Sequence, residues 1–133
     1  MLNITKKVEY GLIAISHIKK YGSNKKLFSS KEIANIYNIP REILAKTMQI
    51  LSKKKYVVSV KGAHGGYFLS KSLNKIKLIE FIEDIEGPVG LVKCNIDHNC
   101  NLLNFCNIKS PLMKINLNIR ETLNSIYLNE ITN

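Results

Sequence analysis

The stretch from Ser29 to Ser70, which decides the fold, reads SSKEIANIYN, IPREILAKTMQILSKKK and YVVSVKGAHGGYFLS. Its first part opens with a capping box, in which Ser29 accepts from the backbone N–H near Glu32 while Glu32 reaches back. Pro40 stands where a helix tolerates proline, at the first turn of the next helix. The third part is a β-type run, a glycine turn and a second β-type run, as in a hairpin. Helix, turn, helix and hairpin predict a winged helix-turn-helix, mainly α with a small β-wing, and a DNA duplex is the object that such a unit fits.

Each helix of this unit combines an apolar face with a polar one. The residues expected to face inward are Ile33, Ala34, Ile36 and Tyr37 in the first helix, and Ile43, Leu44, Met48 and Leu51 in the second. The outer face of the second helix can reach phosphates and base edges, and the wing tip can reach a minor groove. The predicted DNA-binding residues are Lys6, Lys7, Ser29, Ser30, Arg41, Glu42, Lys46, Gln49, Lys61, Gly62 and His64.

The charge of the chain is distributed unevenly. Of 133 residues, 45% are hydrophobic and 23% charged, which is ordinary globular composition, and the net charge is +10. Residues 1–77 hold 16 Lys and Arg against 3 acids, whereas residues 78–133 hold 4 against 7. A surface that binds a polyanion requires such a concentration of positive charge, whereas a generically basic protein would be basic throughout. No stretch is apolar enough to span a bilayer and no signal peptide is recognisable, so we expect a cytoplasmic protein with no membrane partner.

Two further helices are predicted, one before and one after the helix-turn-helix and hairpin. Residues 5–20 form a helix with Thr5 as its N-cap and Gly22 at its end, with Val8, Leu12, Ile15 and Ile18 on one stripe and His17 at the surface. After a connection over residues 71–77, Leu78 to Glu86 form a short helix that directs Ile79, Ile82 and Ile85 inward. Gly87 and Pro88 end it. Glu83, Asp84 and Glu86 are interpreted as a solvated face of this helix.

The last part of the chain is predicted to form a long helix from Ser110-Pro111 onward. Leu112, Ile115, Ile119, Thr122 and Ile126 are spaced as in a coiled-coil seam, and Leu117 and Leu123 add a second apolar strip. This is more apolar surface than one small domain can cover, which favours a homodimer; the alternative is a terminal helix packed on its own chain. The expected organisation is a DNA-binding region (1–77), a short helix with a cysteine loop (78–109) and a dimerisation helix (110–133), all in one compact domain.

Residues 89–109, here called the cysteine segment, lack regular periodicity apart from a possible helical turn near Leu102 to Phe105, and they contain every cysteine of the chain. Cys94, Cys100 and Cys106 are spaced C-x5-C-x5-C, which is too wide for a zinc knuckle. Evenly spaced thiolates can instead hold an inorganic cluster, with one ligand position left to another group. Zinc with His98 as fourth ligand and three uncoordinated thiols are the alternatives. No catalytic arrangement is recognisable elsewhere, so we predict no enzyme and no small-molecule substrate.

Over nearly its whole length the chain resembles the Rrf-type winged-helix transcription regulators, a family that includes the iron–sulfur cluster assembly regulator and the nitric-oxide-sensitive repressor. The resemblance rests on MLNITKKVEYGLIAI, LSKKKYVVSVKGAHGGYFLS, IEDIEG and the C-x5-C-x5-C segment before a final helix. It implies a homodimer that binds pseudo-palindromic operator DNA, with a 2Fe–2S or 4Fe–4S cluster held by the three cysteines. It also implies a regulator, most often a repressor, that senses nitric oxide, redox or iron–sulfur status.

The resemblance also suggests the fourth ligand. The cluster assembly regulator uses a histidine three residues after its third cysteine, and that position here is Lys109. In nitric-oxide-sensing relatives the ligand is a carboxylate of the first helix from the other subunit, and the matching residue here is Glu9. The alternatives are a Glu9 that only pairs with a surface lysine, and His98 as the ligand. Lys46 also matches the nitric-oxide repressors, whereas Glu42 and Ile43 replace their asparagine and histidine.

The expected protein is therefore a homodimeric, cluster-binding repressor, closer to the nitric-oxide-sensitive repressor than to the cluster assembly regulator. Within DNA binding, the alternative is a thiol- or zinc-switched regulator on the same scaffold. The alternative outside DNA binding is a small iron–sulfur redox protein. That alternative would not explain the basic winged helix-turn-helix.

Overall fold

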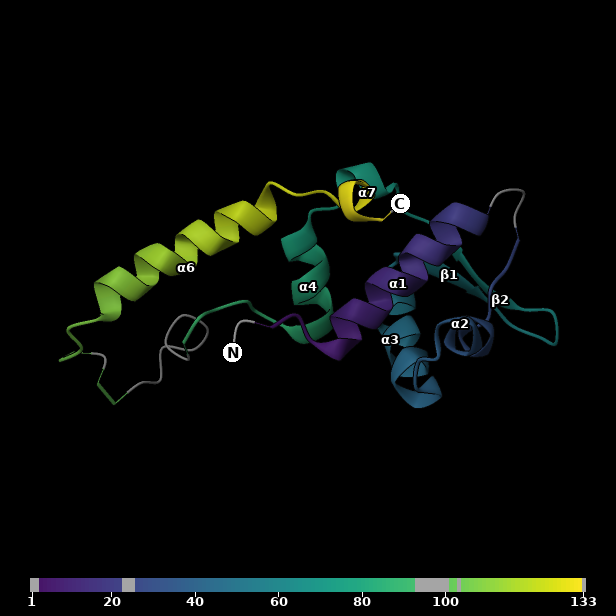
Figure 1. The fold of residues 1–133 in the computed structure, drawn as a ribbon, viewed down its shortest axis with the longest axis horizontal. Helices are drawn as coiled ribbons and strands as arrows, with labels where there is room; N and C mark the ends of the chain where they lie inside the picture. The colour runs from purple at the N-terminus through teal and green to yellow at the C-terminus, as the bar shows by residue number, and fades with distance from the viewer. Residues whose placement is uncertain (1–2, 23–25, 93–100, 103, 133) are drawn as a thin grey trace.

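The computed structural model describes residues 3–22, 26–92, 101–102 and 104–132 (Figure 1). Its elements, in chain order, are α1 (Lys6–Tyr21), α2 (Ser30–Tyr37), α3 (Arg41–Lys53), β1 (Val57–Val60), β2 (Gly66–Leu69), the 3-10 turn η2 (Leu73–Lys75), α4 (Leu78–Glu86), α6 (Lys109–Asn124) and α7 (Leu128–Ile131). The predicted fold class, mainly helical with a two-stranded antiparallel wing, is confirmed. Among the helices of these ranges, none has both the length and the apolar character that crossing a membrane requires.

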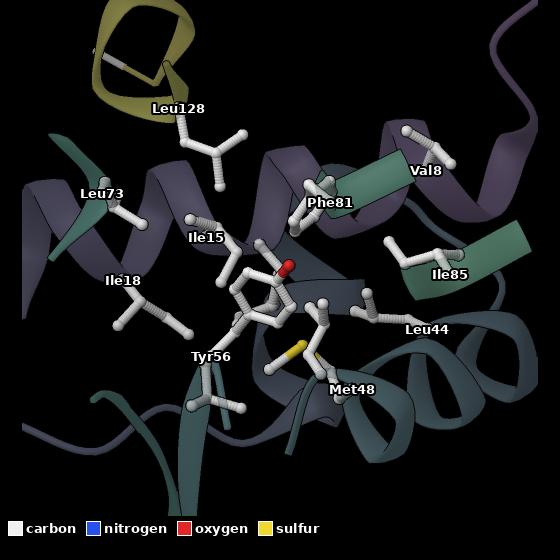
Figure 2. Close-up of a cluster of buried hydrophobic side chains, with 14 of the residues drawn as sticks. Val8, Ile15, Ile18, Leu44, Met48, Tyr56, Leu73, Phe81, Ile85 and Leu128 are labelled. Atoms are coloured by element: carbon white, nitrogen blue, oxygen red, sulfur yellow. The ribbon is translucent and has the colours of Figure 1, made fainter. Parts of the chain in front are cut away.

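The core lies where α1, α3, α4 and β1 meet, and Leu128 of α7 closes it from one side (Figure 2). The helices approach closely at Gly11, where an added Cβ would stand 3.2 Å from both Ile85 and Phe81 of α4. A larger residue would push the helices apart, so glycine permits the tight crossing. The fully buried Phe81, absent from the predicted inward set of α4, meets the Tyr56 ring edge-on at 5.3 Å.

The first helix of the helix-turn-helix buries fewer residues than predicted, whereas the second is packed much as expected. Ser29 caps α2 by accepting from the Glu32 N–H, as expected. Ile33 and Ala34 are buried, but Ile36 and Tyr37 are 55% and 42% exposed, so their assignment to the inward stripe was wrong. The reason is length, because α2 ends at Asn38 in a left-handed conformation after little more than two turns. In α3, Leu44, Met48 and Leu51 are buried as predicted, Ile43 is half-buried, and Thr47 joins the buried set.

The wing is an antiparallel hairpin whose register pairs Val57 with Leu69 and Val60 with Gly66. Phe28, just before α2, forms an additional bridge with Tyr67, with N–H···O distances of 3.1 and 2.8 Å. This bridge connects the start of the helix-turn-helix to β2, next to Gly66, where the strand leaves the wing tip. The wing is therefore held at a fixed position beside α2 and α3.

The end of the chain differs from the predicted single long helix. The helix α6 begins at Lys109 and ends at Asn124, and a short helix, α7, follows after a break. The break occurs because residues 126–128 hydrogen-bond to the backbone before and within α4: the Leu78 N–H donates to Ile126 and the Leu128 N–H donates to Ile76. Lys19 of α1 then donates to the Thr132 carbonyl at 2.7 Å. Thus α7 belongs to the body formed by α1 to α4 and the hairpin, whereas α6 extends away from it (Figure 1).

His17 was expected at the surface, and that expectation was wrong. It is 6% exposed, bonds to the Tyr37 hydroxyl at 2.8 Å through Nδ1, and lies against the rings of Tyr21 and Phe28. The position on the apolar side of α1 results from Tyr37, twenty residues later, which supplies its polar partner. His17 thereby ties α1 to α2.

This burial predicts a pH-dependent stability. Desolvation lowers the pKa of His17, so the folded protein favours the neutral ring. The contribution of the neutral ring is fully present above the unfolded-state pKa and is lost as the pH falls below it. We expect the urea midpoint to drop between pH 8 and pH 5 in the parent protein, and to drop less in His17→Gln. Equal drops in both proteins would show that His17 does not carry this dependence.

Candidate DNA-binding surface and cysteine segment

The outer face of α3 presents the four polar side chains that the sequence predicts. Arg41, Glu42, Lys46 and Gln49 are all exposed, and the Arg41 guanidinium bonds to Asn35 of α2 at 3.1 Å. The buried residues of α3 face α1 and α4, so the opposite side of the helix is free for a ligand. The short connection from Asn38 to Pro40 sets the angle between α2 and α3. The arrangement can place a helix in a major groove.

The wing tip adds a second exposed region. Lys61, Gly62 and His64 are exposed, and Gly62 has φ +114°, a conformation that side chains rarely adopt. The Gly65 N–H closes the turn by donating to the Gly62 carbonyl at 3.0 Å. The tip therefore presents backbone and a cation without bulk, which suits a narrow groove.

The remaining predicted DNA-binding residues lie elsewhere. Ser29 and Ser30 are half-buried at the start of α2, close to the wing, and the Ser29 hydroxyl is occupied by its capping bond. Lys6 and Lys7 are exposed on the first turn of α1, which lies near the end of α4 and away from the wing (Figure 1). The Thr5 hydroxyl donates to Glu86 of α4 at 2.9 Å, which fixes that end of α1.

The predicted cluster ligands are only partly described. Cys94, Cys100 and His98 lie outside the described residues, as does part of the cysteine segment. Cys106 is a half-buried free thiol shortly before α6. Glu9 pairs with Lys6 at 2.8 Å, with 43% of its side chain exposed, and this contact raises the pKa of Lys6. Among the described residues, no three His, Cys, Asp or Glu side chains gather as a metal site.

The donor set nevertheless has the chemistry of an iron–sulfur site. Soft thiolates are the ligands that cluster irons prefer, and the segment contains three of them in thirteen residues. Cys106 is partly accessible and is not used in a disulfide. In the turn predicted near Leu102 to Phe105, the Phe105 N–H donates a hydrogen bond to the Leu102 carbonyl at 2.9 Å.

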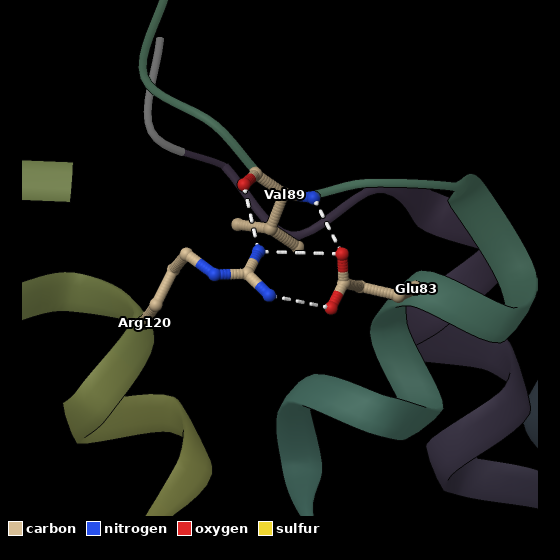
Figure 3. A network of polar contacts seen from close by, with 3 residues as sticks. All are labelled: Glu83, Val89 and Arg120. Carbon is tan, nitrogen blue, oxygen red and sulfur yellow. Dashed lines mark hydrogen bonds and ion pairs between the residues drawn. The ribbon is translucent and has the colours of Figure 1, made fainter. Parts of the chain in front are cut away.

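Sequence reasoning missed a polar network at the start of the cysteine segment. Arg120 of α6 contacts both carboxylate oxygens of Glu83 on α4, at 3.0 and 3.3 Å, and donates to the Val89 carbonyl at 3.0 Å (Figure 3). The Val89 N–H in turn donates to Glu83 at 3.1 Å. The interpretation as a solvated face was therefore wrong for Glu83 and Asp84, which are half-buried, whereas Glu86 is exposed as predicted and accepts a hydrogen bond from Thr5. Each of them bonds to a residue that is distant in sequence, and no local pattern announces such a partner.

The helix α6 itself is mostly uncovered. Of its sixteen residues, all of them described, Asn116 alone is buried, and it accepts from the Leu91 N–H at 3.3 Å. Met113, Ile115 and Leu117 are 45%, 48% and 55% exposed. A hollow of about 500 Å³ lies between α6, the end of α4 and the start of α1. Its apolar lining residues are Ile4, Val8, Ile82, Pro88, Val89, Ile119 and Leu123.

Comparisons with known proteins agree with this fold. A protein of Aquifex aeolicus (strain VF5), named as an HTH-type transcriptional regulator, is 42% identical over 76 residues, which are 57% of this chain and 51% of that protein. The match thus spans about half the length of this relative. CymR (YrzC), the global cysteine regulator of B. subtilis, superposes with a TM-score of 0.74 at 26% identity, covering 99% of this chain and 97% of that one. IscR of T. potens gives a TM-score of 0.71 at 28% identity, covering 98% and 85%.

The family is identified by a match over almost the whole chain. Residues 4–133 fit the family Rrf2, described as iron-dependent transcriptional regulator. This family and the relatives above are regulators and not enzymes, which confirms the expectation that the chain has no catalytic role. The family resemblance seen in the sequence is confirmed at this level, and the chain belongs to the Rrf2 family of transcriptional regulators.

Proposed function

We propose that this protein is a homodimeric repressor that binds operator DNA and responds to nitric oxide, redox or iron–sulfur status through a cluster in the cysteine segment. The proposed ligands are Cys94, Cys100, Cys106 and Glu9, and the cluster is 4Fe–4S or 2Fe–2S. The proposal includes the three-part organisation of residues 1–77, 78–109 and 110–133, in which α6 is the dimerisation helix and α7 packs back on the first part. It also places the protein nearer to the nitric-oxide-sensitive repressor than to the cluster assembly regulator.

The observation that carries the DNA-binding part is the exposed outer face of α3 next to an exposed wing tip. Arg41, Lys46 and Lys61 supply cations on these two surfaces, and the body behind them is packed. The positive charge of the chain is concentrated in the same region, residues 1–77. Phosphate contacts give such a surface its affinity, and base-edge contacts from α3 would give it sequence preference.

The dimer is supported by the uncovered apolar residues of α6. The helix buries one polar residue in its own chain, Asn116, and leaves Ile115 48% exposed beside Ile119 on the side that lines a hollow, so this side needs another surface to cover it. A second copy of α6 fits, because a two-fold symmetric pair would present two copies of α3 to the two half-sites of an operator.

The cluster is supported by donor chemistry and by position. Cys106 lies shortly before α6, which begins at Lys109, and residues 89–91 are bonded to α4 and α6, so both ends of the cysteine segment are attached to the proposed dimer helix. When bound, a cluster would supply a centre that reacts with nitric oxide or oxygen. What the chain itself does is to hold the thiolates close to elements that connect with the reading unit.

Two lysine variants test the reading surface. Lys46→Ala is expected to weaken operator binding by about 1–3 kcal/mol, roughly 5- to 150-fold, and to relax preference at one base pair. Lys61→Ala should weaken binding more evenly across sequences and reduce the slope of log affinity against log salt by about 1. Fluorescence anisotropy on the chain's own promoter fragment at several salt concentrations measures both effects. Lys114→Ala, an exposed lysine on α6, is the matched control. Unchanged affinity in Lys46→Ala and Lys61→Ala alike would contradict the assignment of this surface.

A thiol-switched regulator is the second candidate, favoured by the free, partly accessible Cys106. Anaerobic purification separates these possibilities, because a cluster gives brown protein whereas zinc or free thiols give colourless protein. A salt-dependent gel shift then separates a regulator from an iron–sulfur redox protein, which would not bind the promoter fragment.

A further inference from the structure

The helix α4 connects three parts of the molecule through three acidic side chains. Glu83 bonds to Arg120 of α6, Asp84 accepts from the Tyr56 hydroxyl at 2.6 Å, and Glu86 accepts from the Thr5 hydroxyl at the start of α1. Glu83 and Asp84 are neighbours, so their side chains leave the helix roughly 100° apart around its axis and reach different partners. The remaining acid of α4, Glu80, is exposed.

On one side, Glu83 and Arg120 hold the beginning of the cysteine segment. Both backbone groups of Val89 are bonded, the N–H to Glu83 at 3.1 Å and the carbonyl to Arg120 at 3.0 Å (Figure 3). Two residues later, Asn116 of α6 accepts from the Leu91 N–H. The path of the chain toward the first cysteine is thus fixed to α4 and α6 at the same time.

On the other side, Asp84 holds the junction between α3, the proposed recognition helix, and the wing. Tyr56 is fully buried and lies between the end of α3 and the start of β1. Burial, with the hydrogen bond to Asp84, raises the pKa of Tyr56, so the phenol keeps its proton and remains the donor. Lys54, at the end of α3, lies 3.8 Å from the same carboxylate.

The helix between these two sets of bonds is firmly packed. Phe81 and Ile85 of α4 are buried in the core, and α4 has only nine residues. A rotation or shift of so short a helix moves Glu83 and Asp84 together, because packed cores change between discrete arrangements and do not deform smoothly. A change in how the cysteine segment is held would therefore reach Tyr56.

We propose that Glu83 and Arg120 are positioning residues that couple the state of the cysteine segment to the recognition helix and wing, through α4 and the Asp84–Tyr56 bond. The inference rests on the proposed function, in which the cysteine segment is the sensor and α3 the reader. It assigns the coupling to a route that involves neither Glu9 nor the first turn of α1. If cluster binding changes the affinity for operator DNA by some factor, then bound DNA must change the affinity for the cluster by the same factor.

The test measures operator affinity of the full-length protein twice, empty and after anaerobic reconstitution with ferrous iron and sulfide. For the parent protein, the ratio of the two dissociation constants is expected to be about 5- to 150-fold. In Glu83→Ala, Arg120→Ala and the double variant, the ratio should fall to within about twofold of unity. The double variant should be no worse than either single one, because the two residues act as one unit. Arg120→Lys keeps the charge and should retain part of the ratio.

Two controls distinguish coupling from a loss of structure. Glu80→Ala removes an exposed acid from the same helix and should keep the parent ratio. The Glu83 and Arg120 side chains are 28% and 35% exposed, so breaking their pair should leave the protein folded. Tyr56→Phe breaks only the far bond, so it should also abolish the ratio while the Val89 bonds remain.

A second readout does not depend on the cluster. Amide hydrogen exchange at Leu91 is measured in the empty protein with and without the promoter fragment. Bound DNA should change this exchange several-fold in the parent and in Glu80→Ala, and not in Glu83→Ala or Tyr56→Phe. A parent-like ratio and a parent-like exchange response in Glu83→Ala would overturn the inference and leave the proposed function standing. Failure of every protein, parent included, to bind the fragment would overturn both.

Discussion

Ile119→Lys is expected to turn the protein from a dimer into a monomer and to lower operator affinity by about 100- to 10,000-fold, the gain that two linked binding units have over one. Ile119 is half-buried on α6 and lines two hollows, one along the exposed side of α6 and one against α4 and the start of α1. If a second copy fills these hollows, the lysine charge would be buried there without a partner, which is strongly unfavourable. Sedimentation velocity of the variant and the parent at matched concentrations measures the change.

Two related variants make this experiment decisive. Ile115→Lys changes a residue that is 48% exposed on the same seam, so it should break the dimer with less effect on the fold of the single chain. Leu117→Lys makes the same chemical change at a residue that is 55% exposed on the opposite side of α6, beside Ile79, and should remain dimeric. Normal sedimentation of both seam variants would mean that the interface lies elsewhere.

The parts of the fold that could be predicted are those whose signals are local. Thr5 caps α1 and Gly22 ends it, and α4 has the predicted bounds because Gly87, with φ +87°, cannot continue the helix. The change of period after α3 located the hairpin, which begins one residue later than the predicted run. The outer face of α3 was also predictable, since exposure follows from which side of an amphipathic helix is apolar.

The parts that could not be predicted depend on partners far away in the sequence. His17 is buried because Tyr37 and Phe28 surround it, and α6 ends early because residues 126–128 bond to the backbone around α4. The acids of α4 resemble a solvated face in the sequence, yet Glu83 meets Arg120 at a separation of 37 residues and Asp84 meets Tyr56 at 28. Charge patterning describes neighbours on one helix and carries no information about such contacts.

The candidate site divides in the same way. The C-x5-C-x5-C spacing predicts three donors, because three thiols in one short segment are a chemically specific pattern. A carboxylate ligand is different, since acidic residues are common at surfaces and its place in the site depends on a second subunit. For Glu9 the single chain offers a competing partner, Lys6, at 2.8 Å. The choice between these roles needs an experiment.

Cys106→Ala is expected to abolish the brown colour and the iron content of protein reconstituted without oxygen, because two thiolates cannot hold a cluster that needs four ligand positions. Cys106 is the described member of the three cysteines, half-buried and free, so its replacement should leave the fold unchanged. Cys106→Ser is the matched variant, with a harder and weaker oxygen donor, and should give an unstable cluster. Full reconstitution of Cys106→Ala would exclude it as a ligand.

The fourth ligand is tested by four proteins reconstituted side by side: the parent, Glu9→Ala, His98→Ala and Lys6→Ala. If Glu9 is a ligand, Glu9→Ala should lose its visible absorption in air about 10-fold faster or more, since removing even a group that supports a ligand costs about 10- to 100-fold in metal affinity. Lys6→Ala separates the two roles of this carboxylate. A Glu9 that serves only its 2.8 Å pair with Lys6 would give the same result in both variants, whereas a ligand freed from that pair should keep or strengthen the cluster in Lys6→Ala. Should His98→Ala alone change the spectrum, the fourth ligand is His98, and the three-cysteine site and the DNA-binding role are unaffected.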